Sequence, residues 1–152
     1  MANTQAMCTT FMEELLEGVH NFTTGTGDTF KAALYLASAT YNASTTAYST
    51  TGEVTGTGYT AGGVNVTNGT SPAATNTSAT AGVAYWTPSA SITYTSVTLT
   101  TAFDAVLIYN SSASNRAVSV HTFGSQTITA GTFTLTMPSN TTSTALIRLA
   151  TT

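Results

Sequence analysis

A near absence of charged side chains is the feature that most constrains how this chain folds. Lys and Arg together number three and Asp and Glu six, so charged residues make up 6% of the 152 residues, against roughly 25% in an average domain. Hydroxyl side chains take their place, with 37 threonines and 15 serines. Threonine is a β-branched strand former. The composition therefore predicts a mainly β protein, either a β-sandwich or a jelly roll, of one domain's length.

The same composition argues against several classes of function. Three cations are too few to build a phosphate-binding surface, so we expect no nucleic-acid partner. The longest aliphatic run, residues 105–108, is far shorter than the roughly 20 residues that span a bilayer, so we expect no membrane partner. The single cysteine, Cys8, excludes an internal disulfide and a multi-cysteine zinc site. Residues 1–10 lack the features of a signal peptide, which predicts synthesis in the cytoplasm without export by a cleaved signal.

Sheet edges present a difficulty for a chain with a single lysine, Lys31. Soluble β proteins commonly protect their edge strands with lysine and with inward-pointing charge. The edges must therefore be closed by the fold, capped by loops or paired with another chain, which favours a protein that works in an assembly. The alternative is that bulges and short edge strands protect the edges.

Residues 1–22 are expected to form an N-terminal helical segment, followed by a single β domain over residues 23–152. A helix is predicted over residues 10–20, where Thr10 and Glu13 have the spacing of a capping box. Gly18 or Asn21 can end it. The pattern places apolar side chains along one stripe, which consists of Phe11, Met12, Leu15, Leu16 and Val19.

Alternation of apolar and polar residues predicts the strands of the β domain. A half-buried strand is expected over residues 29–37, and short strands near 53–59 and 63–67. Residues 67–81 are predicted to be a long loop. In the second half, strands are expected over the ranges 91–100, 103–110, 116–123, 126–129, 132–137 and 144–149, with hairpin turns at 111–115 and at Ala130–Gly131.

No set of residues predicts catalysis, a metal site or a cofactor, and we expect the protein not to be an enzyme. His20 and His121 are isolated in sequence and are interpreted as surface or turn residues. Ser119 and His121 share a strand face without a third group to orient the base. Glu13, Glu14 and Glu17 are interpreted as a solvated helix face, and the glycines of residues 56–63 as turns.

Tyr85 and the lone tryptophan, Trp86, have two interpretations. Either they form an exposed binding anchor, since these residue types dominate interface hot spots, or Trp86 is a core aromatic that fills one end of a sandwich. The second interpretation is favoured. The first would allow a carbohydrate-binding adsorption module, in which Tyr85, Trp86 and Tyr94 stack on sugar rings.

Several stretches resemble small structural proteins of tailed double-stranded DNA phages. They include the opening MANTQAMCTTFMEELLEGVHNF, the segments DTFKAALYLASA and TGEVTGTGYTAGGVNVTN, and FDAVLIYN followed by RAVSVHTFGSQTITAGTFTLTMP. The resemblance implies a virion component located on the capsid surface, specifically a capsid decoration or cement protein that binds the major capsid protein and forms a homo-oligomer. It carries over no catalytic residues.

Two features of the chain fit such a role. A hydroxyl-rich surface with few charges makes contacts that salt screens little. The apolar residues Phe11, Met12, Leu15 and Leu16 are the expected contact with the shell or with a sister subunit, although they could equally cap one end of the β core. A tail or head–tail connector component is the alternative virion role.

Overall fold

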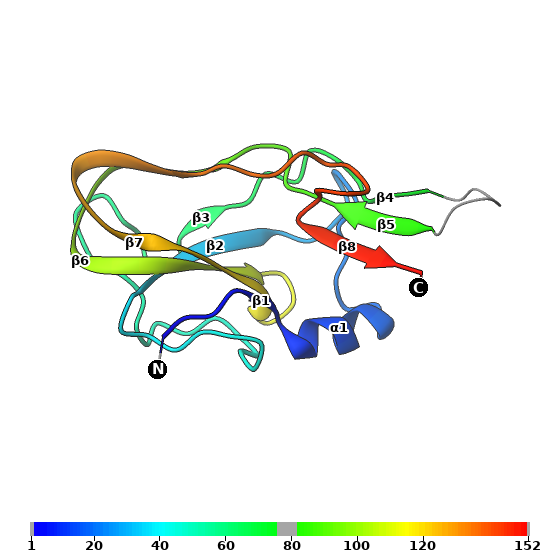
Figure 1. The fold of residues 1–152 in the computed structure, drawn as a ribbon, viewed down its shortest axis with the longest axis horizontal. Coiled ribbons are helices and arrows are strands. Elements are labelled where there is room, and N and C mark those ends of the chain that lie inside the picture. The colour runs from blue at the N-terminus through cyan, green and yellow to red at the C-terminus, as the bar shows by residue number, and fades with distance from the viewer. Residues whose placement is uncertain (1, 76–81, 152) are drawn as a thin grey trace.

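The computed structural model describes residues 2–75 and 82–151 and shows a mainly β protein with two antiparallel sheets and one short helix (Figure 1). This confirms the expected fold class and is consistent with a β-sandwich, while the strand order does not establish a jelly roll. No helix in the described ranges is long and apolar enough to cross a membrane. In chain order the elements are β1 (Ala6–Met7), α1 (Thr9–Leu16), β2 (Phe30–Leu36), β3 (Val64–Asn65), β4 (Ala73–Ala74), β5 (Val83–Trp86), β6 (Ile92–Asn110), β7 (Arg116–Leu135) and β8 (Ile147–Ala150).

The larger sheet has the order β1-β7-β6-β2-β3, and its second-last strand, β2, is buried on both faces. Ala33 and Tyr35 lie on the face that was expected to be open, yet both are fully buried. The prediction of a half-buried strand is therefore wrong. The reason is that the segment after β2 returns across this face, where the ring of Tyr41 lies 3.7 Å from that of Tyr35 and Ser49 O accepts a 2.7 Å hydrogen bond from the Tyr35 hydroxyl.

Strands β6 and β7 form one long hairpin of 19 and 20 residues, in place of the five shorter strands expected there. Ala130–Gly131 is not a hairpin turn, because both residues lie inside β7. Ala130 has a φ of +46°, and the register shifts beside it, between the pairs Val97–Gly131 and Leu99–Ile128. Such a bulge bends a strand without ending its pairing. The expected turn at 111–115 is confirmed, since the hairpin reverses between Asn110 and Arg116.

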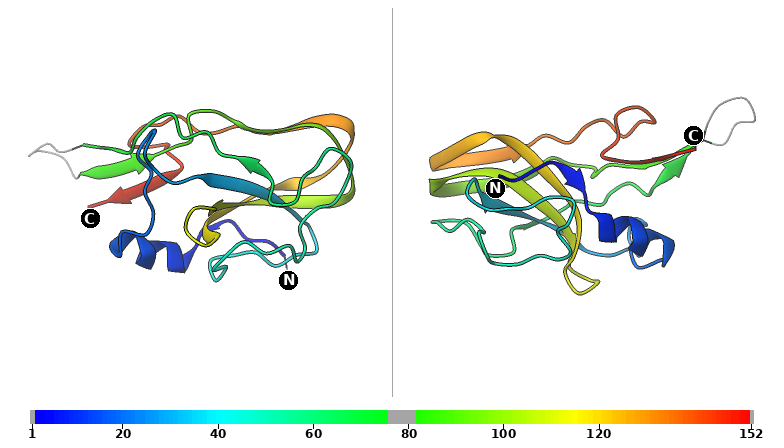
Figure 2. Two further views of the ribbon diagram at one scale, coloured as in Figure 1. Left: turned by 180° about the vertical axis from the view of Figure 1, so that it is seen from behind. Right: turned by 60° about the horizontal axis from the view of Figure 1, so that its bottom comes forward.

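The hairpin curls so that its two halves lie over one another (Figures 1 and 2). Phe133, near the end of β7, packs edge-on against Phe103 of β6 with ring centroids 5.3 Å apart. The hydroxyl of Tyr94, at the start of β6, donates a 2.7 Å hydrogen bond to Ala32 O of β2. Side chains from both halves of this hairpin therefore meet in the core.

A buried carboxylate, Glu53, organises the segment between β2 and β3. Its Oε1 accepts 2.7 Å hydrogen bonds from the Tyr59 hydroxyl and the Gly62 amide, and its Oε2 accepts one of 2.7 Å from the Tyr48 hydroxyl. In place of the strand expected at 53–59, the structure has isolated bridges at Glu53 and at Thr57. Buried acceptors replace a regular ladder here, which is why alternation of apolar residues did not describe the segment.

The smaller sheet has the order β4-β5-β8 and lies at the end of the molecule nearer to α1 (Figure 1). Its strand β4 falls within the predicted loop 67–81, of which residues 76–81 lie outside the described ranges. Three of the four sheet edges, β1, β3 and β4, are only two residues long. Short edge strands therefore do part of the protection that lysine gives in other β proteins.

Candidate functional site

Helix α1 begins and ends differently from the prediction. Cys8 is its N-cap residue and makes no side-chain cap, so the Thr10–Glu13 capping box is not formed. Thr10 Oγ1 is buried and has no hydrogen-bond partner among the described residues. The helix ends at Leu16, and Gly18 follows with a φ of +72°. Gly18 therefore ends the helix in the left-handed conformation that favours glycine, which confirms one of the two expected end points.

The apolar residues of α1 divide between two faces. Phe11 is fully buried and Leu15 is half-buried, whereas the side chains of Met12 and Leu16 are 46% and 91% exposed. The expected interface set is thus split: Phe11 belongs to the core and Leu15 packs partly against it, whereas Met12 and Leu16 form a surface that we call the helix surface. A leucine exposed to this degree on an ordered helix leaves apolar area in water without an internal partner.

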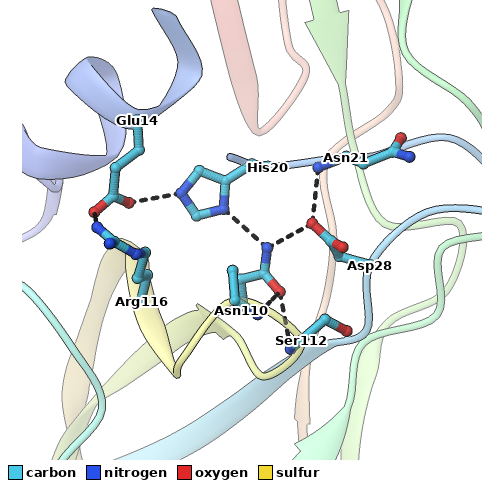
Figure 3. A network of polar contacts seen from close by, with 8 residues as sticks. Glu14, His20, Asn21, Asp28, Asn110, Ser112 and Arg116 are labelled. Carbon is cyan, nitrogen blue, oxygen red and sulfur yellow. Dashed lines mark hydrogen bonds and ion pairs between the residues drawn. The ribbon is translucent and has the colours of Figure 1, made fainter. Parts of the chain in front are cut away.

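The acidic residues of α1 correct a second interpretation. Glu13 and Glu17 are exposed as expected, but Glu14 is only 4% exposed and faces the core. Glu14 Oε2 accepts a 2.7 Å hydrogen bond from Nε2 of His20, and Oε1 accepts one from the guanidinium of Arg116 at the start of β7 (Figure 3). The Glu14 contact raises the pKa of Arg116 above its usual value, through the hydrogen bond first and through charge second.

The hydrogen bonds around His20 fix its tautomer. Asn110 Oδ1 accepts from the amides of Ser112 and Ala113, so its Nδ2 must face His20 Nδ1, at 3.0 Å, and Asp28 Oδ2, at 2.7 Å (Figure 3). His20 Nδ1 is then the acceptor, and the ring proton is on Nε2, which donates to Glu14. His20 is therefore buried and not the surface or turn residue that was expected.

This network joins parts of the chain that are far apart in sequence. It connects α1, the segment after it, the end of β6 and the start of β7, with Glu14 and Arg116 separated by 102 residues. We call these five side chains the polar latch; they are Glu14, His20, Asp28, Asn110 and Arg116. Sequence reasoning missed it because no local spacing connects these residues, although an Asn ending a buried strand was a usable signal of a buried polar contact.

The second histidine lies in a different setting. His121 Nε2 is 2.9 Å from Ser119 Oγ, which confirms that the two side chains share a face of β7. Burial lowers the pKa of His121 to about 4. The described residues contain no group of three or more His, Cys, Asp or Glu side chains arranged to hold a metal ion.

An apolar pocket of about 100 Å³ lies beside α1. Its lining includes Leu15 of α1, Phe22 and Trp86, together with Ile147 and Leu149 of β8. Leu149 is 49% exposed. Polar atoms contribute almost nothing to the lining, so the pocket is an apolar recess between α1 and β8.

Trp86 is a core residue and not an exposed anchor. Its side chain is 2% exposed and lies 4.7 Å from the ring of Phe22, and its Nε1 donates to Asn68 Oδ1 and Thr70 O. Tyr85 is half-buried, and Tyr94 is 2% exposed. The three aromatic residues therefore do not form the sugar-stacking platform that the carbohydrate hypothesis needs, because two of them are covered by the fold.

Comparison with models of known protein families, with curated protein sequences and with solved structures gave no match to this chain.

Proposed function

We propose that this protein is a non-enzymatic structural component of a phage virion, namely a decoration protein that binds the major capsid protein on the outer surface of the shell. The observation that carries the proposal is the exposure of Met12 and Leu16 on a helix that the fold holds in place. Synthesis in the host cytoplasm and attachment to assembled shells are part of the proposal.

The physical basis is burial of the helix surface against a second protein. Burying one leucine side chain is worth roughly 1.5–3 kcal/mol, and Leu16 is almost fully available for such a contact. A ligand that binds only the assembled lattice stabilises that lattice by mass action. Contacts with two or more neighbouring capsid subunits would raise the effective concentration of each further contact.

The polar latch supports this role because it fixes the helix before binding. Glu14 and Phe11 hold the inner face of α1, while Met12 and Leu16 remain outside. A helix of 8 residues is too short to persist alone in water. Because the helix is already ordered, association does not have to order it, and more of the contact energy remains for binding.

The test is binding to empty shells of the phage that encodes the chain, measured by co-sedimentation. Leu16→Asp is expected to weaken binding at least tenfold, because it places a charge where an apolar contact forms. Thr101→Asp is the matched control, since Thr101 is exposed and lies on β6, away from the helix. Equal binding by both variants would contradict the proposal.

Two further measurements separate the proposal from its alternatives. Decoration predicts a copy number of hundreds per particle, whereas a tail or connector role predicts about six or twelve, as expected for a ring with closed symmetry. An apolar contact also predicts that raising the salt concentration leaves shell binding nearly unchanged. A steep loss of binding with salt would contradict the role given to the helix surface.

A further inference from the structure

Strand β8 differs from the other edges of the two sheets. It occupies one side of the order β4-β5-β8 and has four residues, while β1, β3 and β4 have two each. An edge strand of this length presents a row of backbone groups that can pair with another strand. The short edges elsewhere do not offer such a row.

The hydrogen-bond pattern shows which groups of β8 point outward. Thr151 N donates to Gly82 O at 2.9 Å, and the register continues with Leu149 opposite Ala84. Hydrogen-bonded positions alternate along an antiparallel pair, so Leu149 directs its N–H and C=O toward β5. Arg148 and Ala150 direct theirs away, and within the described ranges no hydrogen bond is recorded for these outward groups.

This edge lacks the devices that usually block pairing. It has no proline and no bulge, and its single charged side chain is that of Arg148. The guanidinium is held within its own chain, because Nε donates a 2.6 Å hydrogen bond to Thr142 O. Leu149, in the middle of the edge, is half exposed.

We propose that two copies of this chain pair antiparallel through β8 about a two-fold axis at Leu149, which joins two three-stranded sheets into one of six strands. In this register Arg148 bonds to Ala150 of the second copy and Ala150 to its Arg148, giving four new backbone hydrogen bonds. The two Leu149 side chains meet directly at a non-hydrogen-bonded position.

The residues of β8 favour a second copy of the chain as the partner. They also favour a two-fold axis at Leu149 over one at Arg148. A two-fold axis requires each strand to complement itself, and Leu149 facing Leu149 of the second copy is an apolar pair that does so. An axis at Arg148 would set two guanidinium groups against one another, which is destabilising. With the axis at Leu149, Arg148 lies opposite an alanine.

The pairing uses the backbone of β8, whereas shell binding is assigned to Met12 and Leu16 of α1, so the two proposals can fail separately. A parent chain that binds shells but stays monomeric would overturn only the self-pairing. A parent chain that dimerises but does not bind shells would overturn only the proposed function.

The first experiment measures the mass of the purified chain by analytical ultracentrifugation, with Ala150→Pro as the disrupting variant. Proline removes an outward N–H and leaves the bonds to β5 in place, so a folded monomer is expected. Ala150→Val is the matched control, because it keeps the N–H, and it is expected to remain dimeric. A monomeric wild-type chain at high micromolar concentration, or a dimer unaffected by Ala150→Pro, would overturn the proposal.

The second experiment gives an answer even if Ala150→Pro does not fold. Leu149→Cys places two thiols at a non-hydrogen-bonded pair, where the Cα atoms are about 4.5 Å apart and within disulfide range. Mild oxidation is expected to give a covalent dimer, while Arg148→Cys cross-links at least tenfold more slowly, because its two copies are only diagonal neighbours. Faster cross-linking of Arg148→Cys, or none at Leu149→Cys, would overturn the register. A third outcome is a monomeric chain whose β8 amides are protected from hydrogen exchange only when the chain is bound to shells. In that case β8 pairs with a strand of the shell, and the self-pairing is overturned.

Discussion

Two carboxylates are buried among the described residues, Glu53 and Glu14, and they are stabilised in different ways. Glu53 accepts three hydrogen bonds from neutral donors, which are two tyrosine hydroxyls and one amide. Glu14 is bound by His20 and by Arg116, whose side chain is 45% exposed. The comparison teaches that a chain with few charges can bury an acid either among fixed dipoles or beside a cation that reaches water. If the carboxylate is removed, the buried donors around Glu53 have less freedom to find new partners than Arg116, which reaches water.

Removal of the Glu53 carboxylate is expected to have the largest effect on stability. Glu53→Ala leaves two tyrosine hydroxyls and the Gly62 amide without their acceptor, which should lower the free energy of unfolding by about 3–5 kcal/mol. Urea denaturation measures the change. Glu13→Ala, at an exposed position on α1, serves as the control and should change stability by less than about 0.5 kcal/mol.

The equivalent change at the polar latch should cost less. Glu14→Ala removes the acceptor of His20, and we expect a loss of about 2–3 kcal/mol, because water can reach part of the vacated site. The same denaturation experiment compares the two variants. A larger loss of unfolding free energy for Glu14→Ala than for Glu53→Ala would contradict the view that the surroundings of Glu53 adapt less easily.

Alkaline pH should act on the Glu53 region and spare the polar latch. Burial first, and the hydrogen bond to Glu53 second, raise the pKa values of Tyr48 and Tyr59 above the ordinary value of 10. The folded state then holds these protons more tightly than the unfolded state. The associated stability is fully present below pH 10 and is lost as the pH rises above it.

Two variants test this pH dependence by denaturation at a series of alkaline pH values. Tyr59→Phe should reduce the fall in stability above pH 10, because the variant has no phenol to ionise there. His20→Gln, in the polar latch, should leave the slope as it is in the parent protein. If Tyr59→Phe does not change the fall in unfolding free energy above pH 10, the alkaline loss of stability does not come from the tyrosines bound to Glu53.

The smallest effect is expected at Cys8, which precedes α1. Burial first, and the charge of Glu14 second, raise the pKa of the Cys8 thiol to about 12. Because the thiolate is the reactive form, native Cys8 should resist alkylation near neutral pH. Glu14→Ala should speed alkylation by loosening α1, whereas Glu53→Ala, compared at equal global stability, should not. Rapid alkylation of the parent protein would contradict the packing of this helix.

The sequence predicted the architecture better than the candidate site. Alternation located β2, β8 and the β6–β7 hairpin, because strand faces repeat every two residues wherever one face is buried. It failed at Ala130–Gly131, since glycine after a small residue fits a bulge as well as a turn. It also failed on β2, because the segment that covers its second face folds there through long-range tyrosine contacts.

The helix shows why the site was harder to predict. The helical period allows either Phe11 with Leu15 or Met12 with Leu16 to face the core, and the sequence of α1 alone does not choose between them. The choice depends on His20, which binds Glu14 inside the protein and is itself bound by Asn110. Asn110 lies 90 residues beyond His20 in the chain, so no local pattern could have connected them.

The curled β6–β7 hairpin has a mechanical consequence. Its two strands run through both of the halves that lie over one another (Figure 1), so these halves are joined by continuous chain. A force applied to one half of the hairpin is therefore carried into the other half through the strands themselves. Such a body should unfold in one step.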